Sequence, residues 1–85
     1  MPAQPVRILV VEDNAATRAD LLDALSSSGY NASVATSLAT ARDAVQAQCD
    51  LILLNMMLAD GAGLGLCEEL RAAGRSVPIL SLIHI

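Results

Sequence analysis

Short apolar runs alternate with segments of helical periodicity along the chain. Between the runs, apolar residues recur every three or four positions, which is typical of helices with one buried face. The resulting order, β-α-β-α-β-α-β, predicts an α/β fold with a parallel sheet and right-handed crossovers. The predicted strands cover residues 7–11, 31–35, 50–55 and 77–82.

The predicted elements have recognisable ends. Runs 7–11 and 50–55 do not alternate with polar residues, so both of their faces should be buried, as in a parallel sheet. Polar residues can cap the helices, and glycines can end them. The first helix starts at Asp13 or Asn14 and ends before Gly29, the second starts at Ser37 and continues to Gln48, and the third covers 63–73 and ends before Gly74. Residues 56–62 are predicted to form a loop with a turn at Asp60-Gly61.

Composition restricts the class of protein. The 85 residues are enough for a single domain, 1–85, and 54% of them are hydrophobic, which argues against disorder. The net charge is −4, all five basic residues are arginine, and Tyr30 is the single aromatic residue, so we expect no direct nucleic-acid binding. No apolar run reaches the ~20 residues that a membrane span needs. Cys49 and Cys67 are interpreted as small buried hydrophobes of a reduced, cytoplasmic protein.

Polar side chains lie where three of the predicted strands end. Glu12 and Asp13 follow the first strand, Asn55 closes the third, and Ser81 lies within the fourth. Sites in open parallel sheets form at the carboxyl ends of strands, and an all-oxygen pocket there suits Mg²⁺. The alternative is that the acidic pair only starts the following helix, whose N-terminus favours negative charge.

Other chemistry finds little support. A P-loop needs a lysine, which the chain lacks, and the glycines from Gly61 to Gly65 do not form the dinucleotide-binding pattern. His84 is the single histidine and lies next to the C-terminus, so no nucleophile and base pair is available. We therefore expect a protein that is not an enzyme.

The segments RILVVEDN, DLILLN followed by MMLADGAGL, and VPIL resemble the receiver domain of two-component response regulators, over residues 7–80. The resemblance implies a flavodoxin-like, doubly wound sheet in the order 2-1-3-4-5. It also implies a histidine kinase or phosphotransfer protein as partner, which phosphorylates an aspartate at the end of the third strand. By the same resemblance, Glu12, Asp13, the acceptor position Asn55 and the backbone carbonyl of Met57 would hold Mg²⁺.

The chain departs from the family at several of these positions. Asn55 lacks the carboxylate oxygen that forms an acyl phosphate, and the pocket holds two formal charges instead of three, so Mg²⁺ binding should be weak or absent. Ile83 takes the place of the family's switch hydroxyl, with Ser81 nearby, and Ala59 stands where proline is common. The family's lysine and fifth strand do not follow, which predicts an incomplete sheet in the order 2-1-3-4.

Three functional hypotheses remain. The first is a receiver module of a phosphorelay that cannot accept phosphate because Asn55 replaces aspartate. The second is an interaction module that works without phosphorylation and self-associates through its exposed fourth strand. The third is a truncated fragment without function.

Overall fold

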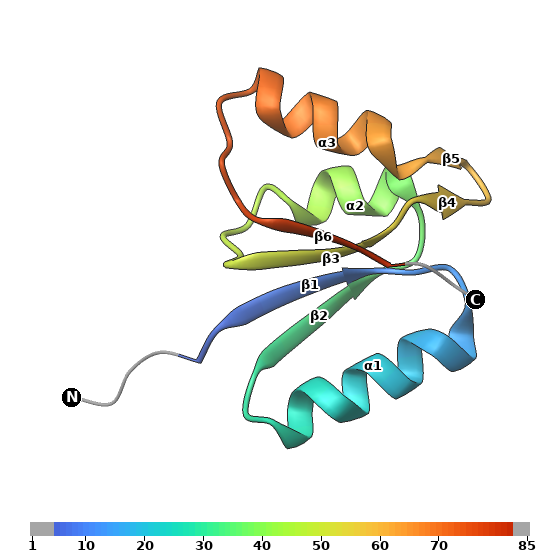
Figure 1. The fold of residues 1–85 in the computed structure, drawn as a ribbon, viewed down its shortest axis with the longest axis vertical. Coiled ribbons are helices and arrows are strands. Elements are labelled where there is room, and N and C mark those ends of the chain that lie inside the picture. The colour runs from blue at the N-terminus through green and yellow to red at the C-terminus, as the bar shows by residue number, and fades with distance from the viewer. Residues whose placement is uncertain (1–4, 83–85) are drawn as a thin grey trace.

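A four-stranded parallel sheet forms the centre of the protein, as a computed structural model describes it for residues 5–82. Helix α1 covers one face of the sheet, and α2 and α3 lie on the other (Figure 1). The strand order β2-β1-β3-β6 confirms the predicted α/β architecture and the order 2-1-3-4. The sheet strands are β1 (Arg7–Val11), β2 (Asn31–Ala35), β3 (Leu51–Asn55) and β6 (Ile79–Leu82), and the helices are α1 (Ala15–Ser27), α2 (Leu38–Ala44) and α3 (Gly63–Ala72).

The two faces of the sheet are covered unequally. On the face of α2 and α3, Ile52 and Leu54 are fully buried and pack with residues of both helices. On the other face, α1 contributes no buried residue, and only half-buried side chains such as Leu21 and Leu25 pack against Ile8 and the rest of that core. The predicted burial of both faces is confirmed for β1 and β3, and the core on the α2 and α3 side is the larger one.

Local chemistry explains where most helices begin and end. The side chain of Asn14 accepts a hydrogen bond from the N–H of Thr17 at 2.9 Å and caps α1. Gly29 and Gly74 follow α1 and α3 with φ of 87° and 78°, a region that glycine enters without a steric penalty. The prediction that the second helix reaches Gln48 is wrong, because α2 ends at Ala44 and tighter turns follow it.

The segment after β3 is more regular than predicted. Residues 56–62 contain two short antiparallel strands, β4 (Met57–Leu58) and β5 (Gly61–Ala62), which we call the β4–β5 hairpin. The last strand is shorter than predicted, since β6 begins at Ile79. Pro78 has no N–H to donate and contributes only its carbonyl, which accepts from the N–H of Ile52 at 3.0 Å.

Two further sequence predictions concern side chains and span length. Cys49 and Cys67 are free, as expected, but they are half-buried at the border of the core rather than enclosed in it. Between residues 5 and 82, no helix has the length and apolarity needed to cross a membrane. Ile83 and His84 lie outside the described residues.

Candidate functional site

The carboxyl ends of β1 and β3 bring together two of the predicted site residues. Glu12 directly follows β1 and its side chain is fully buried, and Asn55 closes β3 with only 6% of its surface exposed. The amide Nδ2 of Asn55 donates a hydrogen bond to Glu12 Oε2 at 2.9 Å. We call this pair and its immediate surroundings the Glu12–Asn55 pocket.

The orientation of the Asn55 amide follows from its neighbours. The backbone N–H of Met57 points at Oδ1 of Asn55, at an N···O distance of 2.9 Å. A backbone N–H can only donate, so the atom that faces it must be the amide oxygen. The amide nitrogen therefore faces Glu12, and both ends of the Asn55 side chain are engaged.

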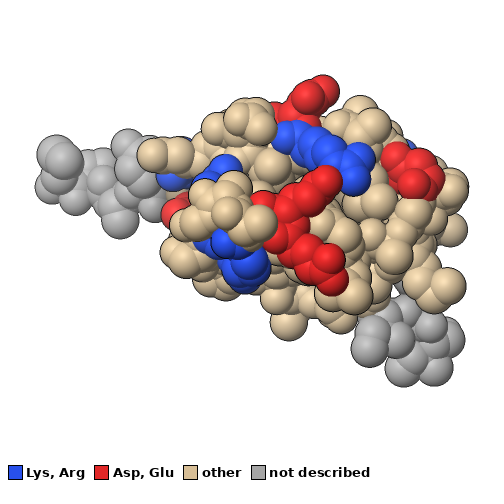
Figure 2. Space-filling view, turned by 90° about the horizontal axis from the view of Figure 1, so that it is seen from above, with Lys and Arg blue, Asp and Glu red and all other residues tan. Residues whose placement is uncertain are grey.

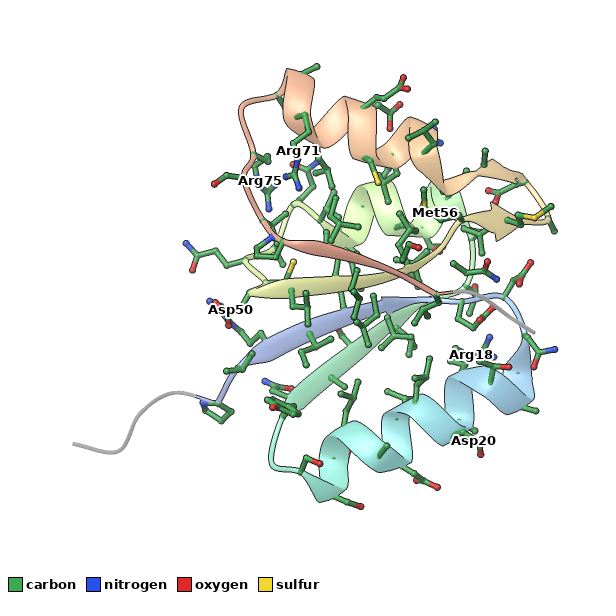
Figure 3. The ribbon with its side chains drawn as sticks, viewed as in Figure 1. Arg18, Asp20, Asp50, Met56, Arg71 and Arg75 are labelled. Carbon is green, nitrogen blue, oxygen red and sulfur yellow. The ribbon has the colours of Figure 1, made fainter. Side chains whose placement is uncertain are left out.

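Glu12 is surrounded by donors from its own chain. Besides the amide of Asn55, its Oε2 accepts a hydrogen bond from the N–H of Asn14 at 3.1 Å. The guanidinium of Arg18, at the pocket end of α1 (Figure 3), donates to the backbone carbonyl of Glu12 at 3.0 Å. Hydrogen bonds to a charged acceptor are stronger than neutral ones, so the two donors to Oε2, from Asn55 and Asn14, offset part of the cost of burying the Glu12 carboxylate.

Asp13 points elsewhere, toward the β4–β5 hairpin. Its side chain is exposed, and Oδ2 accepts a hydrogen bond from the backbone N–H of Ala59 at 3.0 Å. Met57 is 84% exposed, and the backbone group that it directs at Asn55 is its N–H. Ser81 is exposed and lies opposite Leu54 in the pairing of β3 with β6. The aligned Ile83 lies outside the described residues.

The donor set can be compared with what Mg²⁺ requires. Mg²⁺ prefers near-octahedral oxygen ligands, usually with one or two carboxylates. Here the amide oxygen of Asn55 faces the N–H of Met57, and the donor end of the amide occupies Oε2 of Glu12. Within the described part of the chain, no group of three or more histidine, cysteine or acidic residues is placed to hold a metal ion. As arranged, these residues do not fit the ion.

One contact near the pocket was not expected from the sequence. Asp60, which we had interpreted only as a turn residue, accepts hydrogen bonds from the N–H groups of Leu38 and Ala39, at 3.0 and 3.2 Å. These bonds lower the pKa of the Asp60 carboxyl group, with the bond from Leu38 as the largest cause. In the sequence, the Asp60-Gly61 dipeptide indicates a turn, but it does not indicate that Asp60 bonds to Leu38, 22 positions away.

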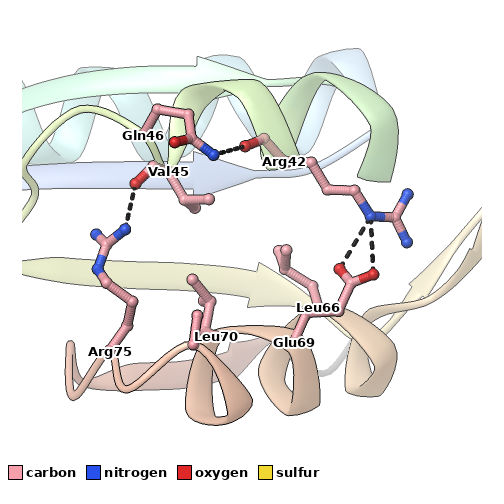
Figure 4. A pocket seen from close by; sticks show the side chains of 8 residues that line it. Arg42, Val45, Gln46, Leu66, Glu69, Leu70 and Arg75 are labelled. Atoms are coloured by element: carbon pink, nitrogen blue, oxygen red, sulfur yellow. Dashed lines mark hydrogen bonds and ion pairs between the residues drawn. The ribbon is translucent and has the colours of Figure 1, made fainter.

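A groove between α2 and α3 lies apart from these residues. It has a volume of about 450 Å³, a floor that includes Val45 and Leu66, and a rim where Arg42 Nε bonds both carboxylate oxygens of Glu69, at 2.9 and 3.2 Å (Figure 4). On the face seen in Figure 2, arginine and acidic side chains lie side by side instead of forming a patch of one sign. Arg75, at the far end of the sheet from Arg18 (Figure 3), donates to the carbonyl of Val45.

Comparison with known proteins identifies the family. Residues 8–83 match the family described as response regulator receiver domain. The chain is 39% identical over 79 residues to the response regulator MprA of Mycolicibacterium vanbaalenii, covering 92% of this chain and 34% of that protein. It is 38% identical over 78 residues to the response regulator MprA of Mycobacterium bovis, covering 91% of this chain and 34% of that protein.

Solved structures of receiver domains have the same fold. The Francisella response regulator 1452 receiver domain superimposes with a TM-score of 0.86 at 20% identity, over 92% of this chain and 64% of that one. A response regulator receiver protein from Pseudomonas putida gives 0.80 at 29% identity, over 99% and 74%. The chain therefore belongs to the response regulator receiver domain family, and it spans about a third of the length of the curated relatives it matches.

Proposed function

We propose that this chain is a signalling module of the receiver type that works without accepting a phosphoryl group, and that it is not an enzyme. One observation carries the proposal: position 55, where β3 ends beside Glu12, holds an amide with both of its ends in hydrogen bonds. Membership of the receiver family supports the signalling class. We further propose that residues 1–85 act as one domain, and a cytoplasmic setting stays a prediction.

The chemistry of the amide supports this proposal. An acyl phosphate forms when a carboxylate oxygen attacks the phosphoryl group, and Asn55 has no such oxygen. The lone pair of its nitrogen is delocalised into the carbonyl, which makes the nitrogen a poor nucleophile. Its Oδ1 accepts from Met57 and its Nδ2 donates to Glu12, so turning the side chain toward an incoming phosphoryl group would break both hydrogen bonds.

The same contacts argue that Mg²⁺ binds weakly or not at all. In a site with three carboxylates, a divalent cation would relieve the repulsion between like charges. Here the N–H group of the Asn55 amide supplies a positive dipole to Glu12 from within the chain. A cation would have to displace that hydrogen bond and would gain no additional charge from position 55. Binding to a histidine kinase or phosphotransfer protein would then depend on surface contacts alone.

Mass spectrometry after incubation with acetyl phosphate and Mg²⁺ tests the proposal. We expect the intact mass of the natural chain to stay unchanged, and a phosphoryl adduct mapped to Asn55 would refute the proposal. The variant Asn55→Asp serves as the matched control, since it restores the carboxylate at this position. Mg²⁺ should raise the melting temperature of this variant, because an ion that binds only the folded state stabilises it, and should leave that of the natural chain unchanged.

A second candidate function is self-association through β6. In the described residues, β6 pairs with β3 along one edge and with no strand along the other. No charged residue occurs in 76–82, and Leu80 is 57% exposed. Natural edge strands usually carry charges or prolines that oppose pairing between molecules, and here only Pro78 could do so. Two copies could therefore pair these edges without repulsion between charged side chains.

Analytical ultracentrifugation distinguishes this candidate from a monomeric module. If β6 mediates association, the sedimentation coefficient should rise with concentration, and Leu80→Arg should abolish that rise. A monomer at all micromolar concentrations would refute it. The third hypothesis, a fragment without function, predicts a thermal melt without cooperativity, whereas both other functions need a cooperatively folded domain.

A further inference from the structure

The backbone N–H groups at the start of helix α2 donate hydrogen bonds to side chains from two different parts of the chain. Ser37 and Thr40 form a capping box: the N–H of Thr40 bonds to Ser37 Oγ, and the N–H of Ser37 to Thr40 Oγ1, each at 3.1 Å. The remaining two N–H groups, of Leu38 and Ala39, each donate to one carboxylate oxygen of Asp60. All four backbone donors that a helix leaves open at its N-terminus are thus satisfied.

The contribution of Asp60 matters because α2 is short. A helix of seven residues has little stability of its own and depends on caps and packing. A carboxylate at the N-terminus also interacts favourably with the helix dipole. The contact is close-packed as well, since a Cβ atom added to Gly61 would lie 3.0 Å from Leu38 Cδ1. The β4–β5 hairpin therefore forms part of the N-terminal cap of α2.

The same hairpin is also bonded to the Glu12–Asn55 pocket and to the neighbouring Asp13, through Met57 of β4 and through Ala59 of the turn. The N–H of Met57 bonds to Asn55 Oδ1, and the N–H of Ala59 bonds to the carboxylate of Asp13. The bonds to α2 are made by Asp60, the residue that follows Ala59. A displacement of the hairpin at Ala59 would have to move or break the bonds that Asp60 makes.

We propose that Asp60 is a strap that couples the Glu12–Asn55 pocket to helix α2. Weakening the contacts of the hairpin with the pocket side then weakens its contacts with α2, and the reverse also holds. The observation that supports it is that two adjacent residues of the hairpin turn bond in two directions, Ala59 to Asp13 and Asp60 to the start of α2. Helix α2 is in turn joined to α3 by the Arg42–Glu69 ion pair, so a change in the pocket would be reported on the face formed by these two helices. This coupling is independent of whether position 55 accepts phosphate.

Amide hydrogen exchange followed by NMR tests the first direction of the coupling. In Asp60→Ala, exchange at Leu38 and Ala39 should accelerate roughly 2- to 30-fold, the range that corresponds to the loss of a helix cap. In the same variant, exchange at the amide of Ala59 should also accelerate, while core amides such as that of Leu53 should stay protected. Asp23→Ala, which removes an exposed carboxylate from α1, is the matched control and should leave all these amides unchanged.

The reverse direction decides between a strap and two unrelated caps. Asp13→Ala should accelerate exchange at Ala59 and also at Leu38 and Ala39, because a true coupling acts equally in both directions. The proposal is refuted if Asp60→Ala affects only Leu38 and Ala39, and equally if Asp13→Ala affects only Ala59. Should Asp60→Ala fail to fold, Asp60→Asn keeps one acceptor oxygen and allows the same comparison at lower amplitude.

Discussion

Replacing Gly63 by alanine tests how tightly α3 is seated against the pocket. Gly63 is the first residue of α3, and its N–H donates to the carbonyl of Met56 at 2.8 Å. A Cβ atom added there would lie 2.9 Å from the backbone oxygen of Asn55 and 3.0 Å from the Cα of Met56. It would also lie 3.1 Å from Leu54 Cγ, so the start of α3 would have to move away from the end of β3.

Two opposing effects determine how much Gly63→Ala changes the free energy of unfolding. Alanine is favoured over glycine in a helix interior by up to about 1 kcal/mol, and by less at a first position. Overpacking against a backbone that cannot turn away costs about 1–3 kcal/mol. We therefore expect Gly63→Ala to lower the free energy of unfolding by about 1–2 kcal/mol, which corresponds to a melting temperature about 4–16 °C lower for a domain of this size.

Gly65 provides an internal control two residues further along the same helix. A Cβ atom added to Gly65 meets no atom within 4 Å, so Gly65→Ala should stabilise the protein by about 0.5–1 kcal/mol through helix propensity alone. Urea denaturation followed by circular dichroism measures both variants. If Gly63→Ala proved as stabilising as Gly65→Ala, the close contact of α3 with Asn55 would be disproved.

Three further predictions concern the core, the strap and a thiol. Leu54→Ala should lower the free energy of unfolding by about 2–5 kcal/mol, because Leu54 is fully buried. Leu80→Ala should have a much smaller effect, because Leu80 is 57% exposed, and urea denaturation measures both variants. The pKa of Asp60 is lower in the folded state than its ordinary value of 3.8. Its contribution to stability is therefore present above pH 3.8 and is lost as the pH falls through the folded pKa. The free energy of unfolding should depend less on pH in Asp60→Asn, and an identical pH profile of the two chains would contradict this. Burial raises the pKa of the Cys49 thiol, so less of the reactive thiolate is present at pH 8. Iodoacetamide should therefore modify Cys49 more slowly than a cysteine in an unfolded peptide, and equal rates would count against this.

The architecture could be predicted from the sequence because the relevant signals are local. In the run Arg7–Val11 every residue after Arg7 is apolar, and in a parallel sheet both faces of such a run are buried, which the structure confirms for residues 8–11. Asn14 and Gly29 carry the chemistry of helix ends in their own side chains and backbones. The predicted proximity of Glu12 and Asn55 followed from the strand order, since the ends of neighbouring parallel strands meet at one edge of the sheet.

The features that the sequence did not reveal depend on contacts between distant segments. The role of Asp60 needs a partner 22 positions away, and no periodicity points to it. Helix α2 was predicted to reach Gln48 because Val45 and Gln48 continue the helical spacing, but the turns after Ala44 end it earlier. The β4–β5 hairpin has strands of two residues, too short to produce any alternation of polar and apolar positions.

The amide of Asn55 determines what the pocket requires. An aspartate there would put a second carboxylate where Nδ2 now lies, 2.9 Å from Glu12 Oε2. Two like charges about 4 Å apart repel by about 4 kcal/mol at an effective dielectric constant of about 20, which favours either a bound cation or protonation of one group. The Asn55 amide carries no charge and donates to Glu12, so this repulsion is absent from the natural chain. Asn55→Asp should therefore be less stable than the natural chain without Mg²⁺ and regain stability with it, whereas equal stability of both chains without Mg²⁺ would mean that this hydrogen bond has no such role.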